Sequence, residues 1–182
     1  EKVLAIWDIT NPKEFQVAAI SCLCFYKKRR VFLIRKTGEG KSAVLLASAT
    51  IKHGVTLVLV PLLGLGCDQV AKGFRLEHRV KAYHLDEHRG HDFIALRDRL
   101  LRVKHKLSQL IILFASPQSL QKKSLWYSMF QKLSSRNLFT LFVVDEADCV
   151  ERNGRSFQPK FYTGIKDLSA LFHSLRDISI LT

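Results

Sequence analysis

The sequence predicts an α/β fold: a parallel β-sheet with helices on both faces, in a single three-layer domain. Short apolar runs alternate with longer amphipathic stretches along the whole chain. The short runs are apolar at nearly every position, as parallel strands covered on both faces are. No internal repeat or linker divides the 182 residues, which suffice for one compact core. Strands and helices in alternation imply right-handed crossovers and hence a parallel sheet.

Each apolar run is assigned a strand and each amphipathic stretch a helix. The predicted strands are residues 31–34, 56–60, 110–114, 141–144 and 178–181, with a weaker one at 80–84. The predicted helices are residues 14–26, 41–52, 92–106, 118–133 and about 160–175. Trp126, Tyr127 and Phe130 follow helical spacing, which favours core packing over a platform for stacking bases.

The charge balance is strongly basic. The chain has 29 Lys and Arg against 16 Asp and Glu, a formal net charge of +13. Such an excess favours polyanionic partners, nucleic acid above all, through phosphate neutralisation and counterion release. A basic domain that is merely one part of a larger assembly is the alternative. No apolar run approaches the length of about 20 residues that spans a bilayer, so no membrane partner is expected.

Cysteine and histidine give weaker signals. The four cysteines form neither a disulfide framework nor a CxxC pair, which favours a reducing, intracellular compartment. The spacing of His78, His84, His88 and His91 fits no standard zinc pattern, and a solvated basic surface is favoured over a metal site.

The first motif with chemical meaning is residues 36–42, Lys-Thr-Gly-Glu-Gly-Lys-Ser, which follow a predicted strand and open a predicted helix. Glycines let backbone N–H groups turn inward around phosphate oxygens, and the helix N-terminus adds positive potential. Lys41 would reach the β- and γ-phosphates, and the Ser42 hydroxyl would ligate Mg²⁺. Arg35 stands where the full pattern has its first glycine, so a chance Gly-Lys-Ser is the alternative.

An acidic pair follows the predicted strand 141–144. Asp145 and Glu146 would lie at the carboxyl end of a buried parallel strand, where ligands bind in such sheets. Asp145 would hold the Mg²⁺, and Glu146 would orient and activate the attacking water. Capping of the next helix is the bland alternative. With the phosphate loop upstream, the pair predicts nucleotide hydrolysis or its remnant.

Residues 145–148 spell Asp-Glu-Ala-Asp, and with their surroundings the chain resembles the RecQ-like branch of the superfamily-two DEAD/DEAH-box helicases. Four further segments resemble this family in the right order: Phe15-Gln16, residues 56–70, residues 114–120 and residues 149–161. The resemblance covers about residues 12–182. It implies a RecA-like fold of the P-loop NTPase class, Mg-ATP as cofactor, and single-stranded nucleic acid, DNA favoured, as partner.

The resemblance also implies the site residues. The catalytic residues would be Lys41, Asp145 and Glu146. The ATP-binding residues would be Lys13, Gln16, Thr37, Gly38, Glu39, Gly40, Lys41 and Ser42. Ser42 and Asp145 would hold the metal. The residues that contact nucleic acid would be Pro61, Leu62, Gly64, Ser116, Pro117 and Phe157.

The end of the sequence resembles the strand that enters the family's Ser/Thr-Ala-Thr motif. Residues 1–182 are therefore expected to be the helicase ATP-binding domain, the first RecA-like domain, cut inside that motif. The second RecA-like domain would be its partner in the same parent chain. The resemblance implies an intracellular protein, nuclear if eukaryotic.

Two other functions stay open, the first because the sequence departs from the family pattern and the second because other enzymes use the same phosphate loop. Asp148 stands where RecQ-like proteins usually have histidine, and Lys36 where the loop usually has proline. Asn153 replaces a tryptophan in the aromatic-rich segment after the acidic pair. A catalytically degenerate, nucleic-acid-binding fragment is therefore the first alternative. A phosphoryl-transfer enzyme acting on a small molecule ranks below it, because no lid segment is evident.

Overall fold

The structure is a computed structural model that describes residues 7, 9–26, 30–36, 38–60, 80–88, 91–103, 110–116, 119, 121, 124–145 and 179–181. The described strands are β1 (Arg30–Val31), β2 (Gly54–Leu59), β3 (Val80–His84), β4 (Leu110–Ala115), β5 (Phe139–Val144) and β6 (Ser179–Leu181). The described helices are α2 (Glu14–Cys24), α3 (Lys41–Lys52), α5 (His91–Leu101), α6 (Leu125–Ser135) and the 3₁₀ turn η1 (Leu85–Glu87).

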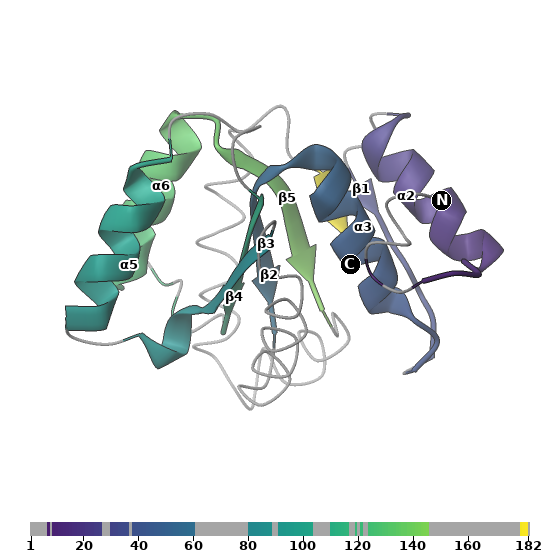
Figure 1. The fold of residues 1–182 in the computed structure, drawn as a ribbon, viewed down its shortest axis with the longest axis horizontal. Helices are drawn as coiled ribbons and strands as arrows, with labels where there is room; N and C mark the ends of the chain where they lie inside the picture. The colour runs from purple at the N-terminus through teal and green to yellow at the C-terminus, as the bar shows by residue number, and fades with distance from the viewer. Residues whose placement is uncertain are drawn as a thin grey trace.

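The described strands form one sheet in the order β1-β6-β5-β2-β4-β3, and all neighbouring pairs are parallel. Helices α2 and α3 lie on one side of this sheet and α5 and α6 on the other (Figure 1). The predicted α/β class, with a parallel sheet between two helix layers, is therefore confirmed.

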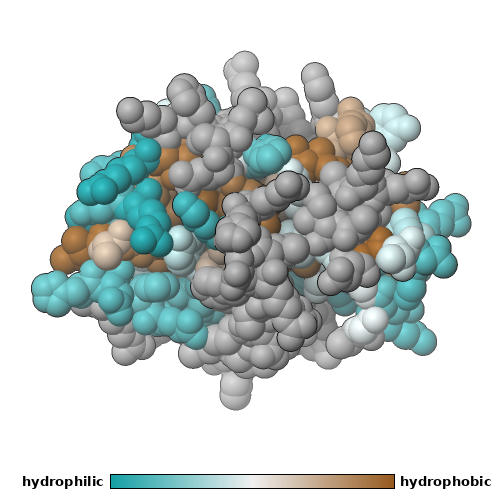
Figure 2. Space-filling view, in the orientation of Figure 1, coloured by the Kyte–Doolittle hydropathy of each residue, from teal (hydrophilic) through white to brown (hydrophobic). Residues whose placement is uncertain are grey.

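The buried apolar residues that the structure describes form two clusters, one on each face of the sheet. Successive side chains of a strand point to opposite faces. In β2, Val55, Leu57 and Leu59 accordingly pack with α5 and α6, whereas Val58 packs with α2 and α3. Trp126, Tyr127 and Phe130 of α6 are buried, which confirms their predicted role in the core. Hydrophilic side chains cover much of the outer side of α5 and α6, on the left of Figure 2.

One strand prediction is wrong in extent and in burial. Residues 31–34 are predicted as a buried strand, but β1 covers Arg30 and Val31 alone, and Phe32 and Ile34 are 73% and 91% exposed. In the described sheet β1 lies at the edge and pairs with three-residue β6 alone. The described ladder therefore ends after Val31; Leu33 still packs against the core, whereas Phe32 and Ile34 lie exposed.

Two helices have ends that differ from the predicted ones. The helix predicted from residue 118 begins instead at Leu125, because the Ser124 hydroxyl accepts a hydrogen bond from the Tyr127 N–H at 3.2 Å and caps the helix. Helix α5 ends at Leu101 rather than at 106, and residues 104–106 lie outside the described part. The helix predicted at 160–175 also lies outside it.

Two cysteines fall within the described residues. Cys22 and Cys24 are both free thiols on α2, and burial raises the pKa of the Cys24 thiol. Among the described residues, no helix combines the length and the apolar character that crossing a bilayer requires.

Candidate functional site: a phosphate loop beside a glutamine

The phosphate loop joins β1 to α3, and its backbone has the shape that two glycines permit. Gly38 and Gly40 have φ angles of +82° and +94°, in the left-handed region that side chains with a Cβ rarely adopt. Gly40 is also the N-cap of α3, so the loop leads directly into the N-terminal end of a 12-residue helix. This is the local geometry that presents backbone N–H groups to an anion. Thr37 lies outside the described residues.

Gln16 fixes this loop against α2. Its side chain is buried, accepts a hydrogen bond from the Lys13 N–H at 2.8 Å and donates one to the Gly40 carbonyl at 2.9 Å. The Lys13 ammonium group adds a bond to the Glu39 carbonyl at 3.2 Å. A Cβ on Gly40 would lie 2.7 Å from Gln16 Nε2, so only glycine allows this close approach. The structure therefore places both predicted adenine-binding residues, Lys13 and Gln16, directly against the loop.

The side chains of Glu39 and Lys41 bond to the loop itself. The Lys41 ammonium group donates to the Arg35 carbonyl at 2.9 Å, which brings its charge back across the turn. The Lys36 N–H donates to the Glu39 carboxylate at 3.2 Å, a bond that a proline at position 36 could not make. Ser42 is exposed at the start of α3.

Asp145 follows β5 at the same edge of the sheet, since all the strands are parallel. It is half-buried, and its N–H donates to the Leu59 carbonyl at 2.9 Å, which ties the end of β5 to the end of β2. Strand β6 lies between β5 and β1 in the sheet. The predicted metal ligands Ser42 and Asp145 thus follow strands separated by one other strand. The predicted base, Glu146, lies outside the described residues.

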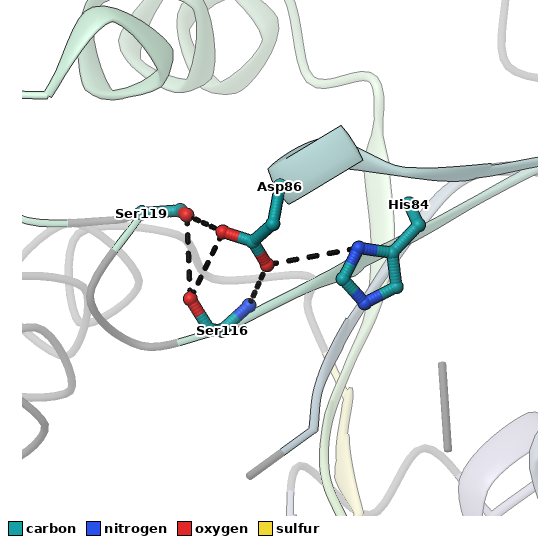
Figure 3. A network of polar contacts seen from close by, with 4 residues as sticks. All are labelled: His84, Asp86, Ser116 and Ser119. Carbon is teal, nitrogen blue, oxygen red and sulfur yellow. Dashed lines mark hydrogen bonds and ion pairs between the residues drawn. The ribbon is translucent and has the colours of Figure 1, made fainter. Parts of the chain in front are cut away.

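At the ends of β3 and β4 the structure adds a residue that the sequence analysis missed. Asp86, in η1, accepts hydrogen bonds from the N–H of Ser116 at 2.8 Å and from its hydroxyl at 3.0 Å. Its carboxylate also accepts from the Ser119 hydroxyl (Figure 3). Of the predicted nucleic-acid contacts, only Ser116 is described. Pro61, Leu62, Gly64, Pro117 and Phe157 lie outside the described residues.

His84 corrects one expectation. It was assigned to a solvated basic surface with its neighbours, but it is 1% exposed, and neither ring nitrogen has a hydrogen-bond partner among the described residues. The burial pattern along β3 alternates, with Val80, Ala82 and His84 all buried. That period of two was visible in the sequence and could have placed His84 inward. The described residues contain no group of three or more side chains suited to hold a metal ion.

The geometry at the loop yields a prediction for stability. Replacing Gln16 with alanine is expected to lower the free energy of unfolding by about 1–2 kcal/mol, because the Lys13 N–H and the Gly40 carbonyl both lose a partner. Urea unfolding followed by tryptophan fluorescence measures the change. Val17→Ala, at the next residue and 46% exposed, is the matched control and should change it by less than about 0.5 kcal/mol. Equal midpoints for both variants would show that Gln16 does not brace the loop.

Comparison with known proteins agrees with the motifs. The model of the DEAD/DEAH box helicase family matches residues 13–182. The chain is 30% identical over 145 residues to the ATP-dependent DNA helicase Q-like 4B of Arabidopsis thaliana, across 80% of this chain and 12% of that protein. It is 31% identical over 147 residues to the RecQ-like DNA helicase BLM of Xenopus laevis, across 80% and 10%.

A third relative shows the same pattern of coverage. The ATP-dependent DNA helicase Q5 of Rattus norvegicus is 29% identical over 134 residues, across 72% of this chain and 13% of that protein. The resemblance to RecQ-like DEAD/DEAH-box helicases is thereby confirmed. The chain spans about a tenth of the length of each of these three relatives.

Proposed function

The chain belongs to the DEAD/DEAH box helicase family, and from that premise we propose that it is the ATP-binding, first RecA-like domain of an ATP-dependent DNA helicase or translocase. In the longer protein, ATP hydrolysis would drive strand separation. The observation that carries the proposal is the phosphate loop, held by Gln16 at the N-terminus of α3. Asp145 lies at the same edge of the sheet.

ATP fits the donors and acceptors at this loop. Its phosphates would lie on residues 37–42, against the N-terminus of α3 and within reach of the Lys41 ammonium group. Gln16 uses one amide hydrogen and one oxygen lone pair in the structure. An amide offers two hydrogens and two lone pairs, so one of each remains to pair with the N6 and N7 edge of adenine. Lys13 would lie beside the base.

Mg²⁺ and the attacking water would bind beyond the carboxyl ends of β1 and β5. The Ser42 hydroxyl and the Asp145 carboxylate are oxygen ligands of the kind that Mg²⁺ prefers. Mg²⁺ bound there would offset the negative charge of the β- and γ-phosphates. Lys41 would stabilise the charge that builds on the γ-phosphoryl group, and Glu146 would orient the attacking water and accept its proton.

Single-stranded DNA would cross the sheet at the strand ends that bear residues 61–64 and 116–117, with Phe157 alongside. Contacts there would be mostly to the sugar–phosphate backbone, which fixes position without reading sequence. The net charge of +13 would strengthen that binding. The second RecA-like domain of the parent protein would complete the nucleotide site, and the protein would act inside the cell, in the nucleus of a eukaryote.

The test is a titration of the folded chain with a fluorescent ATP analogue in the presence of Mg²⁺. We expect saturable binding that excess ATP reverses, that excess GTP reverses poorly, and that weakens when EDTA removes the Mg²⁺. The preference for ATP would come from Gln16, because guanine presents O6 where adenine presents its amino group. Binding that neither nucleotide competes for would contradict the proposal.

The alternative function, a catalytically degenerate fragment that binds nucleic acid, predicts a different result for the same protein. Its motivation is the set of departures from the family, such as Lys36 and Asp148. A chain that binds single-stranded DNA with a steep salt dependence, yet does not bind the ATP analogue, would favour this alternative.

A further inference from the structure

The Asp86 carboxylate occupies all the hydrogen-bond donors that Ser116 could offer to a phosphate. A serine has two donors, its N–H and its hydroxyl. In the structure the N–H of Ser116 points to Asp86 Oδ2 at 2.8 Å and the hydroxyl to Oδ1 at 3.0 Å. Phosphodiester oxygens accept hydrogen bonds and do not donate them. Ser116 therefore cannot bind a phosphate while Asp86 holds it.

Ser119 belongs to the same arrangement. Its hydroxyl also donates to Asp86, and its N–H donates to the Ser116 carbonyl at 3.1 Å, which keeps the two serines together. Three donors from two residues thus converge on one carboxylate (Figure 3). The Asp86 side chain is 11% exposed, so little water competes for these bonds. An anion with two accepting oxygens already lies where a phosphate with two accepting oxygens would bind.

His84 provides a second partner for that carboxylate. Its side chain is fully buried and its Nδ1 lies 3.7 Å from Asp86 Oδ2, just beyond hydrogen-bond distance. Neither of its ring nitrogens is hydrogen-bonded within the described part of the chain. A buried polar group without a partner is costly, so such groups are rare unless an alternative arrangement satisfies them. A small rotation of Asp86 away from the serines would bring its carboxylate onto His84.

From these contacts we infer that Asp86 sets the affinity for single-stranded nucleic acid. Its carboxylate holds Ser116 and Ser119 in the free protein and moves onto His84 when a backbone phosphate takes the serine donors. The inference rests on the proposed function, because it needs a strand that crosses the end of β4. To that function it adds an exchange of anions at the serine donors, where a backbone phosphate replaces the Asp86 carboxylate. Asp86 opposes binding while it holds the serines, and His84 stabilises the carboxylate after it has moved.

The test compares Asp86→Asn with the unsubstituted chain by fluorescence anisotropy of a labelled oligothymidylate. Asparagine keeps the shape but removes the charge, so binding should become roughly fivefold tighter, the size of one weak ion pair. Asp98→Asn is the matched control. It removes the same charge from a side chain 44% exposed on α5, and affinity should stay within about 1.5-fold.

A double-mutant comparison separates this exchange from a merely structural role. Ser116→Ala should change the affinity of the unsubstituted chain little, because the donors of Ser116 are already occupied there. In the Asp86→Asn background the same change should remove most of the gain. Equal effects of Ser116→Ala in both backgrounds would overturn the inference.

The remaining outcomes are distinguishable. An Asp86→Asn variant that is folded and binds no tighter than the unsubstituted chain overturns the exchange and leaves the proposed function standing. Failure of both proteins to bind the oligonucleotide at low salt overturns the two together. If Asp86→Asn does not fold, the ¹³C carboxyl resonance of Asp86 in the unsubstituted chain decides. It must shift as oligothymidylate is added, and an unchanged resonance at saturation refutes the exchange.

Discussion

Replacing Lys41 with alanine is expected to weaken the binding of Mg-ATP by roughly a hundredfold. The Lys41 ammonium group bonds to the Arg35 carbonyl across the phosphate loop. In the complex it would exchange that neutral carbonyl for two phosphate oxygens. A hydrogen bond between charged groups contributes up to about 3 kcal/mol, which corresponds to about two orders of magnitude in the dissociation constant.

The variant should lose affinity without losing its fold. The Arg35 carbonyl is in an exposed contact, so water can replace the ammonium group, and urea unfolding should change by less than about 0.5 kcal/mol. Lys132→Ala, on α6 across the sheet, removes the same charge and is the control for long-range attraction. The measurement is the titration with the fluorescent ATP analogue. If a folded Lys41→Ala variant binds the analogue as tightly as the unsubstituted chain does, the nucleotide does not bind at this loop.

The largest loss of stability is expected from Gly54→Ala, about 3 kcal/mol or more. Gly54 begins β2, the strand that pairs with both β4 and β5, and its φ is +77°. An added Cβ would lie 2.8 Å from Thr140 Cγ2 and 2.9 Å from the Leu138 carbonyl. That carbonyl accepts the Val55 N–H at 2.9 Å, so it cannot retreat without breaking a bond of the ladder.

Gly38→Ala separates the clash from the backbone strain. Gly38 has a similar φ of +82°, but a Cβ there would meet nothing within 4 Å. Replacing Gly38 with alanine should therefore lower the free energy of unfolding by about 1 kcal/mol, the cost of placing a residue with a Cβ at a positive φ angle. Urea unfolding of both variants without nucleotide gives the comparison. Equal losses at the two positions would mean that the junction of α3 and β2 relaxes around the new methyl group.

The hydrophobic pattern of the sequence predicted most of the sheet. Fully apolar runs such as Leu110–Ala115 are typical of parallel strands that helices cover on both faces. The same rule failed for Phe32 and Ile34, since burial depends on what packs on each face of the chain, and that is a tertiary property. Helix boundaries failed where one side chain decides them, as Ser124 does at the start of α6.

The sequence predicted some residues of the candidate site and missed others, because some of its contacts are local in sequence and others are not. The loop was found from its glycines together with the predicted strand before it and the predicted helix after it, and both glycines do have positive φ angles. Gln16 was assigned to the site through resemblance alone, and its contact with Gly40, 24 residues later in the sequence, is known only from the structure. Asp86 lies 30 residues from Ser116, and no local pattern connects them. Contacts of that kind depend on the register of β3 against β4.

The pairing of β1 with β6 bears on how the chain is made. Arg30 and Val31 pair with Ile180 and Leu181, about 150 residues later, and β6 is the described strand that joins β1 to the rest of the sheet. A ribosome releases the chain from its N-terminus. Strands β2 to β5 can therefore assemble before β6 has been made, whereas the pairing of β1 must wait for it. During synthesis, this edge of the described sheet would be the last of its ladders to close.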